Sequence, residues 1–460
     1  MLLDLNRYSF SVFMTEVRAL SRLAWPIMLA QIAALGIGFV DTVMAGAAGK
    51  GDLAAIALGS SAFATVFVTL LGVMTALNPI ISQLFGAGKY KEVGFNGRQG
   101  LWFGLILGVA GMLILLAAIW PFAWYLDLSP QVEETLAWYL VFVAFAVPPA
   151  MLHRALHAYA SSLNRPKPIM WVSWAALLLN IPFNYIFVYG KFGMPALGGA
   201  GCGLATLLVF WFNFAALWLY IKKNGYFESF GLAGSFSKPD RTTLGQMWKL
   251  GWPIGFSYFL EVSLFSFIVF LIAKFGEDQV AAQQVVISLT GIIYMIPQAL
   301  GAAATVRVGY ALGKGWRQKA RYISGVSVFG GWVAALLTMA FLITMRHHLA
   351  AMYTDDAAVL LISAQVLLFA AFFQFFDFTQ CIASYALRGY KITRAPMLVH
   401  GIAFWGFGLL PGYYLANARQ MEIFGFWTAL VVSLAAAAFL LVWLLEKHSM
   451  KQAVEKGLWR

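Results

Sequence analysis

The sequence predicts an all-α protein that crosses a membrane many times, and its composition, its apolar segments and an internal repeat lead to this prediction. Hydrophobic residues make up 61% of the 460 residues and charged residues only 11%, whereas soluble proteins carry about 25% charged residues. The chain therefore has too few charges to cover a soluble protein of this size. A surface that faces lipid needs none, and inside lipid a helix satisfies its own backbone hydrogen bonds.

Twelve segments of the chain are apolar over about 18 residues or more, the length that a helix needs to cross a bilayer. In chain order the predicted spans are 23–46, 53–80, 99–120, 135–153, 170–190, 200–221, 251–273, 280–306, 322–345, 357–387, 397–418 and 423–445.

The basic residues are distributed unevenly between the loops. If both termini lie on one side, all but five of the 31 Lys and Arg residues lie on that side, and the five exceptions are Lys50, Lys191, Lys274, Arg346 and Arg419. Loops rich in Lys and Arg stay in the cytoplasm. We therefore expect both termini to be cytoplasmic, and the net charge of +12 does not imply a nucleic-acid partner.

The second half of the chain repeats motifs of the first half. Trp25-Pro26-Ile27 recurs as Trp252-Pro253-Ile254 at an offset of 227 residues, and from Leu163 and Leu387 onward the sequence suggests a shift to 224. Each half holds six spans, so both halves start on the same side. We expect two six-helix bundles related by a pseudo-two-fold axis along the membrane normal, with a cleft between them.

This repeat divides the chain into two bundles and a connector. We expect an N-terminal six-helix bundle over 1–222 and a C-terminal six-helix bundle over 250–460. The connector, 223–249, is the longest polar stretch and is rich in Gly, Ser and Lys. It is predicted to be a cytoplasmic linker.

Three of the 19 acidic residues lie inside predicted spans: Asp41, Glu261 and Asp377. A carboxylate at the middle of a membrane helix costs about 2.5 to 3.5 kcal/mol, so it usually faces a cavity, an ion or a hydrogen-bond donor. No basic residue is predicted at a comparable depth. The acids must then be either protonated or compensated by a cation from solution.

Polar residues accompany the two acids of the second half. Glu261 lies one turn from Ser257 and one turn from Phe265, and two further faces are polar at helical spacing: Gln374, Asp377, Gln380, Cys381 and Ser384 on the tenth span, and Gln283, Thr290 and Tyr294 on the eighth. A pocket lined by oxygen suits a hard cation such as Na⁺, and the same carboxyls can bind protons instead. The alternative is that these groups only join helices by hydrogen bonds.

Asp41 lies near the outer end of the first span, about 7 Å below the surface at 1.5 Å per residue. Ser61 and Gln284 are predicted at a similar level, and Asp355 and Asp356 lead into the tenth span from outside. An acidic outer opening favours organic cations that carry apolar rings. The alternative for Asp355 and Asp356 is a solvated pair or a charge at a helix start.

Three polar residues of the fifth and sixth spans, Asn180, Asn184 and Thr206, can complete a pocket with Asp41 or can simply join helices by hydrogen bonds. The sequence has no phosphate-binding GxxxxGK[ST] run, no set of spaced zinc ligands and no Ser nucleophile with a neighbouring base. We therefore expect no enzyme activity and no cofactor. The energy for any transport must come from an ion gradient.

Several short motifs, in this order and spacing, resemble the multidrug and toxic compound extrusion (MATE) family, and most closely its bacterial NorM branch. They are Trp25-Pro26-Ile27, Phe39-Val40-Asp41-Thr42, Gly86-Ala87-Gly88, Glu261, Leu387-Arg388-Gly389 and Arg394-Ala395-Pro396-Met397. The resemblance covers about the whole chain. It implies an antiporter of the bacterial inner membrane that expels cationic, lipophilic drugs and dyes, fluoroquinolones among them, by alternating access in exchange for Na⁺ or H⁺.

The resemblance also implies roles for single residues. Glu261 and Asp377 would bind the coupling cation, Na⁺, with Tyr294 beside them, and Asp41 would be the acid of the first bundle. Some relatives carry another acid where this chain has Asn184. This difference favours the second bundle over the first as the place of the coupling-ion site. Asp41, Asp355, Asp356, Gln284, Ser61 and Phe265 are the candidate substrate contacts.

We expect the partners to be cationic amphiphilic small molecules and membrane lipids, and the protein to be a monomer. Two alternatives remain at this point. A flippase for lipid-linked oligosaccharides shares the architecture, but its anionic cargo requires Arg or Lys in the cleft. A membrane scaffold or receptor would use the acids only to stabilise its helices.

Overall fold

The computed structural model describes residues 9–125, 128–234 and 237–454, and these residues form helices without strands. Both chain ends lie outside the described residues. The helices of the first half are α1 Phe10–Ala48, α2 Lys50–Met74, α3 Leu77–Gly86, α4 Tyr90–Tyr125, α5 Pro130–Ser162, α6 Lys167–Tyr189, α7 Gly199–Lys223 and α8 Gly225–Glu228. Those of the second half are α9 Arg241–Ile272, η1 Ala273–Phe275, α10 Glu277–Gly313, α11 Arg317–Ala351, α12 Ala357–Gly389, α13 Arg394–Gly401, η2 Ile402–Leu409, α14 Leu410–Ala418 and α15 Glu422–Val454.

Twelve helical segments of the described chain are long and apolar enough to cross a membrane, and each corresponds to one predicted span. The prediction of an all-α, polytopic fold is confirmed. Three of these spans are composite: α2 and α3 form one, α9 and η1 form another, and α13, η2 and α14 form the third. Most helices extend beyond the predicted spans because their polar end residues continue the helix outside the apolar segment.

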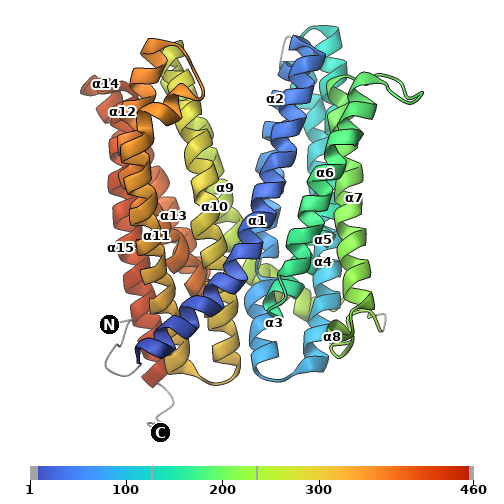
Figure 1. Cartoon of the computed structure of the whole chain (residues 1–460), viewed down its shortest axis with the longest axis vertical. Helices are drawn as coiled ribbons and strands as arrows, with labels where there is room; N and C mark the ends of the chain where they lie inside the picture. The colour runs from blue at the N-terminus through green and yellow to red at the C-terminus, as the bar shows by residue number, and fades with distance from the viewer. Residues whose placement is uncertain (1–8, 126–127, 235–236, 455–460) are drawn as a thin grey trace. The chain divides into compact units, whose positions relative to one another are not determined.

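The chain forms two compact units, and each mixes parts of both halves. One unit contains the chain up to Met28 and from Phe256 onward, and the other contains Leu29–Gly255. The boundaries therefore fall inside α1 and α9. In the Leu29–Gly255 unit, α5 packs against α2, α4 and α7; in the other unit, α12 packs against α10, α11 and α15 (Figure 1).

Helix ends show how far the internal repeat extends. α5 and α12 begin and end 227 residues apart, and the starts of α6 and α13, at Lys167 and Arg394, keep the same offset. The predicted shift at Leu163 and Leu387 is therefore wrong, because the match of those two leucines does not follow the helices. The offset changes only before α7 and α15, where the second half has the shorter connection.

The predicted linker 223–249 ends earlier than expected, because α9 already begins at Arg241. The reason is local: a carboxyl oxygen of Asp240 accepts hydrogen bonds from the amide of Thr243 at 2.8 Å and from its hydroxyl at 2.6 Å. An acid at this position caps the free amides of a helix start. The same hydrogen bonds hold the pKa of Asp240 below its ordinary value.

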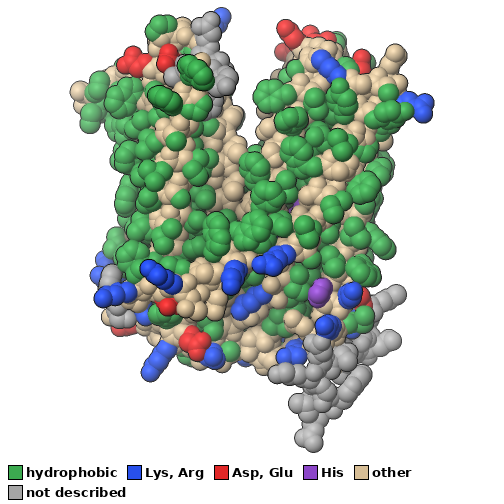
Figure 2. Space-filling model, turned by 180° about the vertical axis from the view of Figure 1, so that it is seen from behind, with side chains coloured by type: hydrophobic (Ala, Val, Ile, Leu, Met, Phe, Trp, Pro, Cys, Tyr) green, Lys and Arg blue, Asp and Glu red, His purple; other side chains and the backbone are tan. Residues whose placement is uncertain are grey.

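Each unit has an apolar belt and a basic end. Figure 2 shows hydrophobic side chains covering the middle of the visible face, and most of its Lys and Arg side chains gathered at the end drawn lower. This agrees with the uneven distribution of basic residues in the sequence. An apolar belt next to a basic end is what a lipid-facing surface with one basic side requires.

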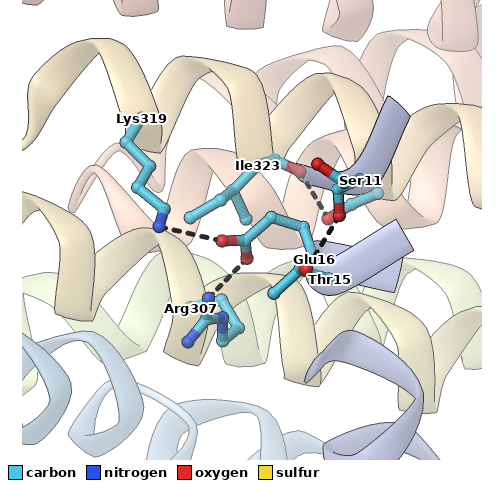
Figure 3. Close-up of polar contacts among 7 residues, drawn as sticks. Ser11, Thr15, Glu16, Arg307, Lys319 and Ile323 are labelled. Atoms are coloured by element: carbon cyan, nitrogen blue, oxygen red, sulfur yellow. Dashed lines mark hydrogen bonds and ion pairs between the residues drawn. The ribbon is translucent and has the colours of Figure 1, made fainter. Parts of the chain in front are cut away.

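The start of α1 is fixed to α10 and α11 by a buried ion-pair cluster (Figure 3). The carboxylate of Glu16, only 1% exposed, pairs with Arg307 and, at 3.1 Å, with the ammonium group of Lys319. Removing one partner of a buried pair leaves an uncompensated charge, which costs about 3 to 5 kcal/mol. Glu16 therefore anchors the first turns of α1 within this unit.

Candidate functional site

Asp41 lies in a compact cluster of neutral hydrogen-bond donors. It is 7% exposed on α1. Its Oδ1 accepts from the side-chain amides of Asn180 at 3.1 Å and Asn184 at 2.6 Å, and its Oδ2 accepts from the hydroxyl of Thr206 at 2.9 Å. The three residues therefore meet at Asp41, an arrangement that both a polar pocket and helix-joining hydrogen bonds allow. Three donors from α6 and α7 thus surround the carboxyl group of Asp41.

This cluster leaves one acceptor unused. The amide of Asn184 also donates to Oδ1 of Asn180 at 3.0 Å, but Oδ1 of Asn184 is buried without a hydrogen-bond partner. Among the described residues no Lys or Arg lies within ion-pair distance of Asp41. The cluster combines a carboxyl group with a free oxygen acceptor, a combination that suits a cationic or hydrogen-bond-donating ligand.

The acids of the second half also meet. Asp377, 5% exposed on α12, accepts a hydrogen bond at Oδ1 from the amide of Gln380 at 2.9 Å. Glu261 on α9 is half-buried, and the phenol of Tyr294 on α10 lies near it. The two carboxyls are close enough to interact electrostatically. Three helices thus bring together the acids and the phenol that the sequence nominated.

This carboxyl pair has fewer donors than Asp41. Oδ2 of Asp377 has no hydrogen-bond partner among the described residues, and no ion pair within 4 Å joins either acid to a Lys or Arg of that part of the chain. Two like charges close together in an apolar interior repel each other. The arrangement is therefore satisfied by a cation or a proton between the two groups.

Arg388 corrects one sequence prediction. The sequence placed it in a cytoplasmic loop, with no basic residue near the acids, but it is 4% exposed, and its guanidinium lies 3.8 Å from the ring centre of Tyr385. It also donates a hydrogen bond to the hydroxyl of Tyr258 at 3.2 Å, and its charge reaches Glu261. The two tyrosine rings hold this cation near the acids without placing it in contact with them.

Other polar residues of the predicted faces are used within the bundle. The side-chain oxygen of Gln283 accepts from the indole of Trp427 at 2.8 Å, and the hydroxyl of Thr290 bonds to the carbonyl of Val286 in its own helix. The interpretation as hydrogen bonds between helices therefore holds for Gln283.

The candidate substrate contacts outside the acid clusters are more dispersed. Asp356 caps α12, because its Oδ1 accepts from the amides of Ala358 at 2.9 Å and Val359 at 3.1 Å. This matches the alternative of a charge at a helix start. Along α12, Asp356 and Asp377 are about 30 Å apart at 1.5 Å per residue, so Asp355 and Asp356 do not join the carboxyl pair.

For three further candidates the described residues show no hydrogen bond or ring contact with the acids. The hydroxyl of Ser61 bonds to the carbonyl of Ala57 at 2.8 Å in its own helix, and Gln284 is exposed. Phe265 packs edge-on against Phe373, with the ring centres 6.2 Å apart. Phe265 therefore belongs to the apolar packing of its unit, beside the acid-bearing face of α9.

Sequence reasoning missed His400. It lies in the span formed by α13, η2 and α14, and its Nε2 is 2.9 Å from Oε1 of Gln380, the residue that binds Asp377. The available signal was a lone histidine one turn after Pro396 in an apolar segment. Only the packing of this span against α12 reveals its partner.

The fold and these clusters define a class of protein. Its members are polytopic membrane proteins with two copies of a six-span unit and with carboxyl groups in the membrane interior. The sequence model of the MatE family matches the chain twice, over residues 26–186 and 253–414, and the second match begins 227 residues after the first. The chain belongs to the MATE family, and the resemblance noted from the motifs is confirmed.

Relatives match along nearly the whole chain. The "Probable multidrug resistance protein NorM" of Neisseria meningitidis serogroup A is 65% identical over 446 residues, covering 97% of both chains, and the protein of the same description from Chromobacterium violaceum is 47% identical, covering 98% of both. A solved structure of the MATE transporter NorM-NG, in a complex that includes a monobody, is similar with a TM-score of 0.81 and 59% identity over 94% of both chains.

Proposed function

We propose that the protein is a secondary active multidrug efflux antiporter, which exports organic cations in exchange for Na⁺, with H⁺ as the alternative coupling ion. The observation that carries this proposal is the carboxyl pair of Glu261 and Asp377, close together, short of donors and without an ion pair among the described residues. Such a pair is stable in lipid only when something positive from solution occupies it.

The relatives support the choice of substrate. Two of them are described as probable multidrug resistance proteins, and a similar solved structure is described as a MATE transporter. In the proposed cycle Asp41, Asp355 and Asp356 attract the cationic drug, with Phe265, Ser61 and Gln284 as further contacts. Glu261, Asp377 and Tyr294 bind the coupling cation. The protein would work as a monomer in the bacterial inner membrane with both termini in the cytoplasm.

Exchange requires only that drug and cation disfavour each other's bound state. A coupling free energy of about 1 to 3 kcal/mol is typical of linked sites and is sufficient to drive the cycle. Occupation of the carboxyl pair would change the packing of α9 and α10 and release the drug outward. The alternating orientation of the two bundles is part of this proposal.

Transport in purified proteoliposomes tests the function. We expect an ethidium-like dye to move against its concentration only when a Na⁺ or H⁺ gradient is imposed, and the gradient that drives it identifies the coupling ion. An ionophore that collapses the effective gradient should stop the flux. Dye movement that ignores both gradients would refute the proposal, and movement of a lipid-linked sugar instead would favour a flippase.

A further inference from the structure

The eleventh span, formed by α13, η2 and α14, contacts both acid-bearing helices through side-chain hydrogen bonds. His400, 6% exposed at the end of α13, bonds to Gln380 on α12, and the indole of Trp405 in η2 donates to the carbonyl of Leu260 on α9 at 3.1 Å. Leu260 directly precedes Glu261. One span therefore reaches the neighbourhood of both carboxyls.

When Asp377 is ionised, as it is when a cation occupies the pair, the hydrogen bonds from His400 to Asp377 have one consistent direction. An ionised carboxylate accepts hydrogen bonds and cannot donate them, so the NH₂ group of Gln380 must face Asp377. Oε1 of Gln380 then faces His400, and Nε2 of His400 must carry the proton that it donates. The orientation of the Gln380 amide is thus fixed at its far end by the histidine.

The histidine ring itself is held in place. It stacks on Phe404, with the ring centres 5.4 Å apart and an angle of 11° between the planes. Phe404 belongs to η2, where eight residues adopt the rare π-helical form, which occurs frequently at functional sites. The ring therefore presents the same nitrogen to Gln380 for as long as this packing persists.

This arrangement leaves one of the two carboxylate oxygens of Asp377 without a hydrogen bond from the described residues. Oδ1 is held by Gln380, whereas Oδ2 has no hydrogen-bond partner among the described residues. The groups that share this region are Glu261 on α9, Tyr294 on α10, and Cys381 and Arg388 on α12. A fixed Oδ1 leaves Oδ2 available to an incoming cation.

We propose that His400 is a positioning residue for the coupling cation: by donating to Gln380 it keeps the amide NH₂ of Gln380 on Asp377 and leaves Oδ2 open to the cation. This inference rests on the proposed cation-coupled function. Without His400, Gln380 can turn its oxygen toward Asp377, where it repels the carboxylate. Cation binding then weakens, while the bundle retains its packing.

The test measures the cation concentration that gives half-maximal dye efflux in proteoliposomes. His400→Phe keeps a ring that stacks on Phe404 but removes the donor, and it should raise this concentration about three- to tenfold, the effect of one hydrogen bond. The maximal rate at saturating cation should stay within about twofold. His400→Gln, whose amide can donate to the same oxygen, should restore most of the lost affinity.

Two further variants separate positioning from general damage. Gln380→Met removes the same connection from the other end, and His400→Phe added to it should cause no further loss, since residues that act through one another are not additive. His157→Phe is the matched control: His157 is also 6% exposed, but it lies on α5 in the other unit. It should leave the half-maximal cation concentration unchanged.

The outcomes distinguish this inference from the proposed function. If the unmodified protein shows cation-driven efflux but His400→Phe does not shift the half-maximal concentration, the positioning role is wrong and the function stands. Effects of His400→Phe and Gln380→Met that multiply would also overturn the inference. If the unmodified protein ignores every imposed cation gradient, the proposed function fails and the inference fails with it.

Discussion

The buried acid of the Asp41 cluster and the buried carboxyl pair of Glu261 and Asp377 are stabilised in opposite ways. Asp41 receives three hydrogen bonds from neutral side chains, whereas Asp377 receives one and lies beside a second carboxyl. The first acid is compensated by the protein itself. The second pair depends on a positive charge from outside, and this difference indicates which site couples to an ion gradient.

The repeat makes this contrast informative. At the offset of 227 residues, Asp41 corresponds to Ile268, Glu261 to Ala34 and Asp377 to Ala150. None of these three acids therefore has an acidic counterpart in the other half. The two halves share a helical scaffold, but their buried charges are not copies of each other, so distinct roles for the two sites are physically reasonable.

The largest expected effect is the loss of either acid of the pair. Glu261→Gln or Asp377→Asn should reduce gradient-driven efflux to background, because one remaining carboxyl no longer needs a cation to offset repulsion from its neighbour. Drug resistance of cells that express each variant measures this effect. Expression in the membrane is the control, and undiminished resistance in either variant would contradict the assignment.

A smaller effect is expected for Asp41→Asn. Asparagine offers a single acceptor oxygen to the amides of Asn180 and Asn184 and the hydroxyl of Thr206, so at least one buried donor loses its partner, at a cost of about 1 to 3 kcal/mol. Dye binding should weaken and thermal stability should fall.

The half-maximal cation concentration of Asp41→Asn should stay that of the unmodified protein. A shift in this concentration as large as that of an acid-pair variant would remove the contrast between the two sites. Thr206→Val, which deletes one donor and keeps the side-chain shape, is the matched control and should have a milder effect on stability.

The smallest effect concerns the outer acids of α12. Asp356→Ala should cost about 1 kcal/mol of stability, since it removes a helix cap, and Asp356→Ser should restore most of it. Asp355→Ala should leave the melting temperature unchanged. Dye binding that stays impaired in the serine variant would show that Asp356 contacts substrate as well; equal destabilisation by both alanine variants would contradict the capping role.

The spans and the three acids were predictable from the sequence because both depend on local composition. Apolar length defines a membrane helix, and a carboxyl within one is conspicuous. The position of Arg388 was not predictable, because an arginine at a helix end ordinarily extends to the headgroups. Here Tyr258 on α9 and Tyr385 on α12 hold it inside. The helical start of α9 within the expected linker depended on one cap, Asp240.

The role of His400 was hidden for a similar reason. Its side chain has no polar neighbour at helical spacing that would mark a site, and its partner, Gln380, lies on another span. The start of the shift in repeat register was also misjudged, because the leucine match at Leu163 and Leu387 precedes the point where the helix ends change their offset. Features that depend on which helices touch require the three-dimensional structure.

The most direct test of the account is equilibrium binding of radioactive Na⁺ to the purified protein, with proton release recorded in the same samples. We expect the unmodified protein to bind Na⁺ and to release any protons that Na⁺ displaces from the acids. Asp41→Asn should do the same, and the double variant Glu261→Gln with Asp377→Asn should do neither. Cation binding that survives in the double variant and disappears in Asp41→Asn would place the coupling ion at the other acid and refute the central claim.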